Sequence, residues 1–452
     1  MIEARLVESV AKRTRLQDGP VSFHSVTTDS RKDSNAALFV PLSGERFNGH
    51  HYLDSAIASG AIAAIWQEQE PVPTSIPASF QLYFVDDPLH ALQELAQLYR
   101  DEINPYVIGI TGSNGKTTTK DIVFQLLGGE PFVHRTAGNL NNHIGVPLTL
   151  LSMPKECKFA VVEMGMNHAG EISFLSKLAK PDLAIVTNIG EAHIEHLGSR
   201  QGIASAKMEM LDGLKQDGFL VLDGDEPLLN GFQQEKTVSI GFNHQNKEAI
   251  ATFQPKADGF TFSFLDEKDW YLPLLGEHNV KNAAYGIWIA RQVGFAPETI
   301  KERLANVTIT GMRLEKVAGP NGSTFINDAY NANPSSMKAA IETIKSLPEF
   351  KRRIVVLGDI YELGPDEEAL HRSVVSAIDT PITNVVCVGE KGYWIYDEVK
   401  QQNGAIAVEH VENVSDVAET IRPLLNHDTV VLLKASRRLA LEQVLSAVKG
   451  GA

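Results

Sequence analysis

Residues 106–120, YVIGITGSNGKTTTK, constrain this chain more than any other stretch. Residues 107–110 are an apolar, β-branched run typical of a buried parallel strand. A turn that needs glycine's freedom in φ follows, and an amphipathic helix then runs to about residue 127. Such a strand, loop and helix turn backbone N–H groups and a helix N-terminus towards an anion, while the lysine reaches terminal phosphates and a threonine takes Mg²⁺. The stretch predicts a nucleoside triphosphate site formed by Gly112, Ser113, Asn114, Gly115, Lys116, Thr117 and Thr118.

The match is not to the general Walker pattern, because Ile110 stands where that pattern has its first glycine. An ordinary glycine turn between a strand and a helix is the alternative reading of a lone glycine pair. The Lys-Thr-Thr sequence between a strand and a helix favours the phosphate site.

Length and composition set the class of protein. With 452 residues, two to three domains are expected, and 43% hydrophobic and 21% charged residues are typical of a globular chain. The net charge of −15 argues against nucleic-acid binding. Cys157 and Cys387 read as buried reduced thiols. The charged N-terminus lacks the apolar core of a signal peptide, and no apolar run has the length of a membrane span, so we expect a cytoplasmic protein.

The pattern of strands and helices predicts an α/β protein. Before residue 85 we expect short strands and one helix over 54–66. From 86, a helix leads into the phosphate loop, and apolar runs at 159–165, 183–190, 219–226 and 236–242 read as parallel strands. Residues 249–272 alternate and read as antiparallel strands. A second α/β unit begins near residue 313, with strands at 324–328, 352–359, 384–389 and 429–436 and a helix over 335–347.

Polar side chains at strand ends are candidate ligands of Mg²⁺ and phosphate. Glu163 ends the apolar run FAVVE, where a carboxylate is costly unless it meets a cation such as Mg²⁺ or reaches solvent. His193 and His196 follow the next strand, whose carboxyl end opens into the same crevice. Position favours His193, but spacing alone does not decide between the two.

Lys207 lies on the apolar stripe of a predicted helix, four residues after Ile203 and three before Met210. A lysine there either extends its ammonium group to solvent or loses its proton. A neutral amine reacts with CO₂ to give a carbamate, whose oxygens suit a second Mg²⁺. Both readings stay open on periodicity.

Further polar groups suit a nucleotide. Asn279 and Asn282 lie three apart on a helix, so both amides face one way and suit an adenine edge. Arg313 lies at the junction of the second and third units, where closure would bring it to a phosphate. Asp328 and Asn331 follow a strand and suit a ribose hydroxyl. Each also reads as a cap or surface turn; their joint occurrence favours the nucleotide.

These segments follow one another along the chain: GITGSNGKTTTK, VVEMGMNHAGEI, TNIGEAHIEHLGS, AKMEM, GEHNVKNAA, GMRLE, NDAYNANPSSM, LGDIYELG and KASRR. The series resembles, in order, the motifs of the Mur ligases, ATP-dependent amide ligases of peptidoglycan precursor synthesis, and hence of cell-wall biogenesis, cell shape and cell division. GNLNNHIGVPLTLL and YNANPSSM resemble most the member that adds D-alanyl-D-alanine to UDP-N-acetylmuramoyl tripeptide. Ala435 departs from the glycine that the family more often has in KASRR.

The resemblance implies three domains: a small α/β UDP-sugar-binding domain (1–85), a central ATP-binding domain with a mostly parallel sheet (86–312), and a Rossmann-like domain binding the dipeptide (313–452). It implies that Lys116 holds the β,γ-phosphates and that Arg313 contacts a phosphate. Thr117 and Glu163 would ligate one Mg²⁺, and His193 with carbamylated Lys207 a second. Asn279 and Asn282 would contact adenine, and Asp328 the ribose. The implied substrate-binding residues are Ser30, Arg31, Asn139, Asn141, Asn142, Ser436 and Arg437.

The family chemistry passes through an acyl phosphate, which the amine of D-alanyl-D-alanine attacks. We expect a monomer that needs ATP and Mg²⁺. The alternatives are a related ligase that adds a single amino acid, a folylpolyglutamate-type synthetase, or a nucleotide-dependent switch protein without catalysis. The switch reading leaves the polar clusters in all three units unexplained.

Overall fold

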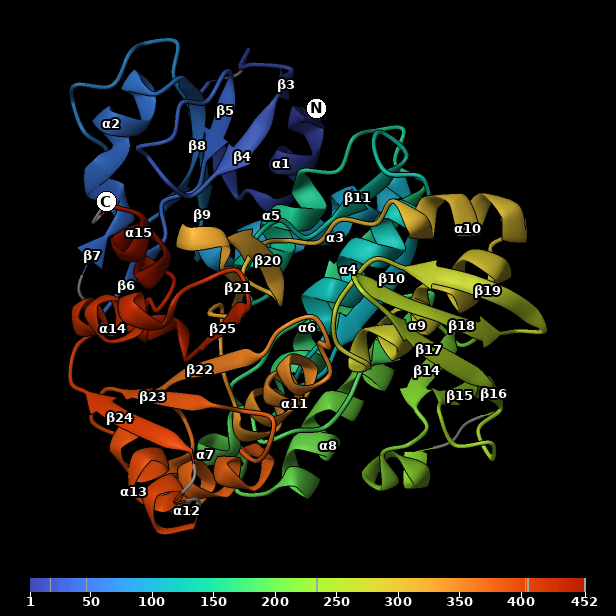
Figure 1. Cartoon of the computed structure of the whole chain (residues 1–452). Helices are drawn as coiled ribbons and strands as arrows, with labels where there is room; N and C mark the ends of the chain where they lie inside the picture. Colours follow the sequence, from blue (N-terminus) through green and yellow to red (C-terminus); the bar gives the residue numbers. More distant parts are fainter. Residues whose placement is uncertain (17, 46, 233–234, 403, 405, 451–452) are drawn as a thin grey trace.

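The computed structural model describes residues 1–450 except 17, 46, 233–234, 403 and 405. Three larger sheets divide the chain into an N-terminal unit, drawn in blue in Figure 1, a central unit in cyan to yellow, and a C-terminal unit in orange and red. The α/β class and the three-unit architecture predicted from the sequence are confirmed.

The N-terminal unit is built on a five-stranded sheet of order β2-β9-β8-β5-β4. Its strands are Arg13–Thr14, Gln81–Val85, Ala61–Gln67, Ala37–Phe39 and Ser25–Thr27. The helix predicted over 54–66 is wrong: α2 covers only Leu53–Ala58, and the apolar run after Gly60 is strand β8. Gly60 has φ +100°, which ends the helix, and the following run AIAAIW is buried between β5 and β9. A short apolar run does not distinguish a helix from a buried strand, which is why its pattern misled us.

The central unit carries a seven-stranded sheet of order β11-β12-β10-β13-β14-β15-β16, with every neighbouring pair parallel. The strands are Val133–Arg135, Phe159–Glu163, Tyr106–Thr111, Leu183–Val186, Phe219–Asp223, Thr237–Gly241 and Glu248–Ala249. The predicted antiparallel region is confirmed as β17 (Thr252–Lys256), β18 (Gly259–Phe264) and β19 (Glu267–Leu272). After β10 the chain builds β11 and β12 on one side and β13 on the other. Such a switch point opens a crevice at the carboxyl ends of the strands.

Both faces of the central sheet are covered by helices. Successive strand residues point to opposite faces, so Val107 and Ile108 enter different cores. On one side lie α3 (Pro88–Ile103), α5 (Gly145–Leu151), α6 (Glu171–Ala179) and α8 (Arg200–Met208). On the other, α4 (Lys116–Leu126) packs against α9 (His278–Gln292). Because the sheet is buried on both faces, its strands read as continuous apolar runs.

The C-terminal unit has a six-stranded sheet of order β20-β21-β25-β22-β23-β24, parallel except for the β20–β21 pair. The strands are Glu315–Ala318, Thr324–Asn327, Thr429–Lys434, Arg352–Gly358, Asn384–Val388 and Ala407–Val411. Helix α11 (Pro334–Lys345) starts at the predicted cap, where the Asn333 side chain accepts from Ser336 N–H. The predicted domain limits at 85/86 and 312/313 stay predictions. Within the described ranges, no helix combines the length and apolar character needed to cross a bilayer.

Candidate active site

The phosphate loop lies between the end of β10 and the start of α4, and two of its glycines are required by close contacts. Gly112 has φ +152°, and a Cβ built on it would lie 1.8 Å from Thr187 Oγ1. Gly115 has φ +78°, and its Cβ would lie 2.8 Å from Asn282 Oδ1. Asn188 fixes the loop, since its carbonyl accepts from Ser113 N–H and its side-chain Oδ1 from Asn114 N–H. The loop therefore has one shape that other residues would disturb.

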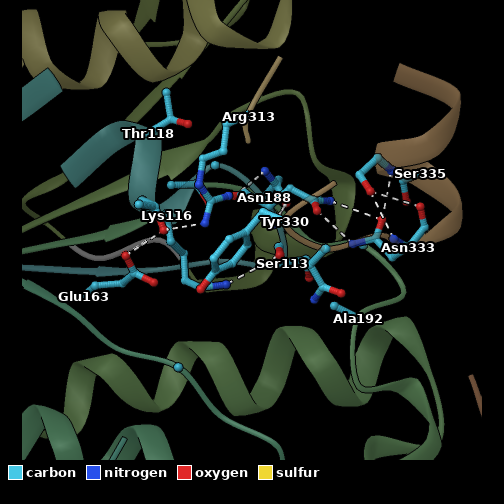
Figure 2. A pocket seen from close by; sticks show the side chains of 18 of the residues that line it. Ser113, Lys116, Thr118, Glu163, Asn188, Ala192, Arg313, Tyr330, Asn333 and Ser335 are labelled. Carbon is cyan, nitrogen blue, oxygen red and sulfur yellow. Dashed lines mark hydrogen bonds between the residues drawn. The ribbon is translucent and has the colours of Figure 1, made fainter. Parts of the chain in front are cut away.

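A cavity of about 640 Å³ opens at this edge of the central sheet and extends to the C-terminal unit. Figure 2 shows Lys116 and Glu163 of the central unit on the same side of the pocket as Arg313 and Tyr330, with Asn333 beside Ser335 at its other end. The predicted residues that line it are Ser113, Asn114, Gly115, Lys116, Thr117, Thr118, Asn139, Asn141, Asn142, Glu163, His193, Lys207, Asn279, Asn282, Arg313, Asp328 and Asn331. The predicted residues outside the lining are Gly112, Ser30, Arg31, Ser436 and Arg437.

The start of α4 suits a phosphate group. Lys116 Nζ donates to Gly112 O at 2.6 Å, so the side chain folds back along its own loop. Burial lowers the pKa of Lys116, and the nearby Glu163 carboxylate opposes that shift. No side chain among the described residues caps α4. The first residues of α4, including the lysine, line the cavity, and a helix N-terminus without a side-chain cap is an arrangement that binds anions.

Two buried oxygen donors lie beside the loop. Thr117 Oγ1 donates to Glu163 Oε2 at 2.9 Å, and Asn141 Nδ2 donates to Glu163 Oε1 at 2.9 Å. Lys120 Nζ lies 3.9 Å from Glu163 Oε2. A hydroxyl and a carboxylate are hard oxygen ligands, so this pair fits Mg²⁺. No cluster of three His, Cys, Asp or Glu side chains suited to a metal occurs among the described residues, so phosphate and water oxygens would complete the shell.

His193 and Lys207 both reach the cavity. His193 has φ +63°, and its Nδ1 lies 2.6 Å from Glu362 Oε2, which belongs to the C-terminal unit. The neighbouring His193 imidazole lowers the pKa of Glu362. Lys207 is 2% exposed on the apolar face of α8, so its side chain does not extend to solvent. Burial first, and the charge of Lys116 second, lower the pKa of Lys207 well below its usual range.

The amides and carboxylate predicted to read the nucleoside are partly engaged with protein groups. Asn282 Nδ2 donates to Asn279 Oδ1 at 2.9 Å, and Asn279 Nδ2 donates to Leu275 O at 2.7 Å. Asp328 Oδ2 accepts from Lys434 Nζ at 2.6 Å, and Lys434 also donates to Asn331 O. These contacts hold the four polar residues at the cavity wall in fixed orientations.

The outlying substrate residues are held elsewhere. Arg31 pairs with Asp29 on the surface of the N-terminal unit, and Ser30 O accepts from two serine hydroxyls. Ser436 Oγ accepts from Tyr361 N–H, and Arg437 pairs with Glu442. The structure thus brings most residues predicted to bind the nucleotide to one cavity, whereas these two pairs do not line it.

Sequence reasoning missed several residues of the cavity. Lys434 ends the apolar strand β25, and Asn188 follows β13, so the rule that selected Glu163 also applies to them. Asn333, which lines the cavity, donates from Nδ2 to Asn114 Oδ1 at 2.8 Å, and nearby Glu191, outside the lining, accepts from Ser335 N–H at the start of α11. These contacts join the central and C-terminal units. No local sequence pattern predicts a contact between residues that are 219 positions apart.

Comparison with known proteins gives the class. A model described as Mur ligase middle domain matches residues 110–290, the Mur ligase glutamate ligase domain matches 312–437, and the Mur ligase family catalytic domain matches 22–100. The UDP-N-acetylmuramoyl-tripeptide–D-alanyl-D-alanine ligase of Bacillus subtilis is 42% identical over 94% of this chain and 92% of its own length. The chain belongs to the Mur ligase family and is an ATP-dependent ligase.

Within this family, the chain is similar to MurF over nearly its whole length. A crystal structure of MurF from Acinetobacter baumannii superposes with a TM-score of 0.86 at 28% identity and covers 99% of both chains. MurF from Thermotoga maritima in complex with ADP superposes with a TM-score of 0.82 at 26% identity, over 94% of this chain and 97% of that one.

Proposed function

We propose that this ligase joins D-alanyl-D-alanine to UDP-N-acetylmuramoyl-tripeptide and forms UDP-N-acetylmuramoyl-pentapeptide, ADP and phosphate. One observation carries the proposal: a single cavity unites the phosphate loop, the buried Thr117–Glu163 oxygen pair and polar residues of the C-terminal unit. An amide ligase needs such a meeting point for a γ-phosphate and two substrates. The names of the similar proteins supply the substrate identities.

In the first step, a terminal carboxylate oxygen of the tripeptide attacks the γ-phosphorus, and the bond to the β,γ-bridging oxygen breaks to release ADP. Two anions must approach each other, so positive charge and N–H dipoles have to offset their repulsion. Lys116 and the N-terminus of α4 provide both at the loop. Arg313 reaches the same space from the C-terminal side.

Mg²⁺ bound by Thr117 and Glu163 would neutralise phosphate charge during transfer. We assign a second Mg²⁺ to His193 and a carbamylated Lys207. Carbamylation forms a bond between the neutral Lys207 amine and the carbon of CO₂, with loss of one proton. The low pKa of the buried amine supports this assignment, because only the neutral amine reacts.

In the second step, the amine of D-alanyl-D-alanine attacks the acyl carbon, loses a proton, and displaces phosphate from a tetrahedral intermediate. Positioning that amine contributes up to roughly 7–11 kcal/mol towards the barrier. Water must be excluded, because it would hydrolyse the acyl phosphate. The contacts of Asn114 with Asn333 and of Glu191 with Ser335, which hold the C-terminal unit against the phosphate loop, suit that requirement.

Substrate contacts follow from the position of each group. We assign Asn279 and Asn282 to adenine, Asp328 and Asn331 to the ribose, and Arg313 to a phosphate. The muramoyl substrate would be held by Asn139, Asn141 and Asn142 at the cavity and by Ser30 and Arg31 in the N-terminal unit. Ser436 and Arg437 would meet the dipeptide. We further propose that the chain acts as a monomer in the cytoplasm, where its nucleotide substrates are made.

The test is a phosphate-release assay with a panel of UDP-muramoyl peptides and with D-alanyl-D-alanine, single amino acids or no acceptor. The proposal predicts release only when a muramoyl tripeptide and the dipeptide are both present. Full-rate release without the dipeptide, or equal release with a single amino acid, would contradict it.

A further inference from the structure

Helix α4 holds the segment that connects the central and C-terminal units, through three side chains on one face. Thr117 Oγ1 accepts from Arg313 Nη2 at 2.9 Å. Asp121 Oδ2 accepts from Thr310 N–H at 2.8 Å and from its hydroxyl at 2.7 Å. One turn later, Gln125 Oε1 accepts from Thr308 N–H at 3.0 Å. Residues four apart share a helix face, so the connecting segment 308–313 runs antiparallel along the helix whose N-terminus forms the phosphate site.

Asp121 is the strongest of these attachments. It is fully buried, and its second oxygen accepts from Arg135 Nη1 at 2.6 Å. Lys120 Nζ lies 3.7 Å from the same oxygen. Two cations and two hydrogen bonds from Thr310 therefore fix one carboxylate in one orientation.

The main-chain hydrogen bonds of the connecting segment change from the central unit to the C-terminal unit between Thr310 and Leu314. Thr310 is bonded to α4, whereas Leu314 N–H donates to Asp328 Oδ1 in the C-terminal unit. Met312 and Leu314 have φ of +60° and +52°, a backbone conformation that persists only where neighbouring contacts enforce it. Arg313 stands between these two residues, so its direction depends on how both sides of the segment are held.

Arg313 is poised for an anion. Its Cζ lies 4.2 Å from the centre of the Tyr330 ring, and its buried Nε has no hydrogen-bond partner among the described residues. Figure 2 shows the side chain reaching into the cavity next to Lys116 and Tyr330. A buried N–H without a partner is costly, and a phosphate oxygen would satisfy it.

We propose that Asp121, acting through Thr310, is the positioning residue that aims Arg313 at the phosphates of the bound nucleotide, with Gln125 as a second attachment point. The inference rests on the proposed function for the contact of Arg313 with a phosphate of ATP, and it does not depend on the identity of the peptide substrates. According to this proposal, helix α4, whose N-terminus forms the phosphate site, also sets the position of Arg313 at the start of the C-terminal unit.

The test is a double-mutant cycle between Thr310→Val and Arg313→Met, read by the affinity for a non-hydrolysable ATP analogue in calorimetry. Thr310 is exposed, so the valine variant keeps the core intact. Thr310→Val removes the hydroxyl bond to Asp121 and keeps the N–H bond to the same oxygen, so only part of the positioning is lost. We expect affinity about three- to tenfold weaker in the protein that keeps Arg313. In the Arg313→Met background, Thr310→Val should change nothing further. The KM for ATP should rise by the same factor while the KM for D-alanyl-D-alanine stays constant.

Three variants sharpen the cycle. Thr310→Ser keeps the hydroxyl and should restore wild-type affinity. Thr252→Val is the control. It removes another exposed threonine hydroxyl, which donates to Ser263 Oγ within the antiparallel sheet of β17 and β18, and it should leave the affinity for the analogue unchanged. Asp121→Asn should weaken the affinity for the ATP analogue more than Thr310→Val does. Because Asp121 is buried, the melting temperature of this variant is measured as well. If the variant does not fold, the Thr310 variants alone test the inference.

Equal losses in both Arg313 backgrounds, or no loss in either, would overturn the inference. The result is separable from the proposed function, because analogue binding needs no peptide substrate. A wild-type protein that forms no product from the muramoyl tripeptide and dipeptide would refute the proposed function and leave the cycle interpretable.

Discussion

Replacing Gly112 with alanine would test the shape of the phosphate loop. The added Cβ would lie 1.8 Å from Thr187 Oγ1, which is far inside van der Waals contact. Thr187 Oγ1 donates to Asn114 O at 2.6 Å, so moving the threonine aside breaks a bond that holds the loop. Moving the loop instead shifts the N–H groups that face the phosphate.

The size of the effect follows from these contacts. A non-glycine residue at φ +152° adds strain of about 1–3 kcal/mol, and loss of the Thr187 bond adds about 1 kcal/mol. We therefore expect the free energy of unfolding to fall by about 2–4 kcal/mol. A loop shift near 1 Å costs on the order of 10²-fold in turnover, since positioning is what the loop contributes.

Urea denaturation would measure the loss of stability, and phosphate release would measure the loss of turnover. Calorimetry with an ATP analogue would show how much of that loss comes from weaker nucleotide binding. Gly294→Ala is the matched control, because Gly294 has φ +93° but nothing within 4 Å of an added Cβ. It should lose stability from strain alone and bind nucleotide normally. Adding Thr187→Ala to Gly112→Ala removes the clashing oxygen and should recover part of the affinity. Wild-type affinity in Gly112→Ala, or no recovery in the double variant, would refute this reasoning.

Lys207→Ala should abolish phosphate release, and added acetate should restore part of it by standing in for the carbamate; full activity in the alanine variant would remove Lys207 from the mechanism. Glu163→Gln should raise the Mg²⁺ concentration for half-maximal activity by about tenfold or more, because a neutral amide is a weaker ligand for Mg²⁺; chelation of Mg²⁺ should stop the wild-type enzyme, and an unchanged Mg²⁺ titration would argue against Glu163 as a ligand. Burial raises the pKa of Tyr83 from 10.0 to about 12. Tyr83 therefore ionises at a lower pH in the unfolded chain than in the folded one. Its contribution to the free energy of unfolding is complete below pH 10 and is lost as the pH rises towards 12. Tyr83→Phe should flatten that loss in denaturation curves, and identical curves for the two proteins would contradict the assignment.

The sequence was most informative where chemistry and burial conflict. Glu163 at the end of an apolar strand and Lys207 on an apolar helix face were selected for that reason, and both line the cavity. For Lys207, burial argues against extension of the ammonium group to solvent, one of the two readings that periodicity left open. Parallel strands were predictable because a sheet covered on both faces requires continuous apolar runs.

The remaining errors and omissions come from information that local patterns do not contain. The apolar residues after Gly60 fit a buried helix as well as a buried strand. Their pairing with β5 and β9, which the sequence does not reveal, makes them a strand. Lys434 becomes a site residue because β25 lies beside β21, which brings it to Asp328. The attachment of Thr310 to Asp121 likewise depends on where the connecting segment crosses α4.

The central claim is that the substrate carboxylate attacks the γ-phosphate of ATP held by the loop around Lys116. The most direct measurement uses muramoyl tripeptide labelled with ¹⁸O in its terminal carboxylate and follows the label by mass spectrometry of the released phosphate. An acyl phosphate predicts that each phosphate carries one oxygen from the carboxylate. Amide formation with unlabelled phosphate would contradict the account.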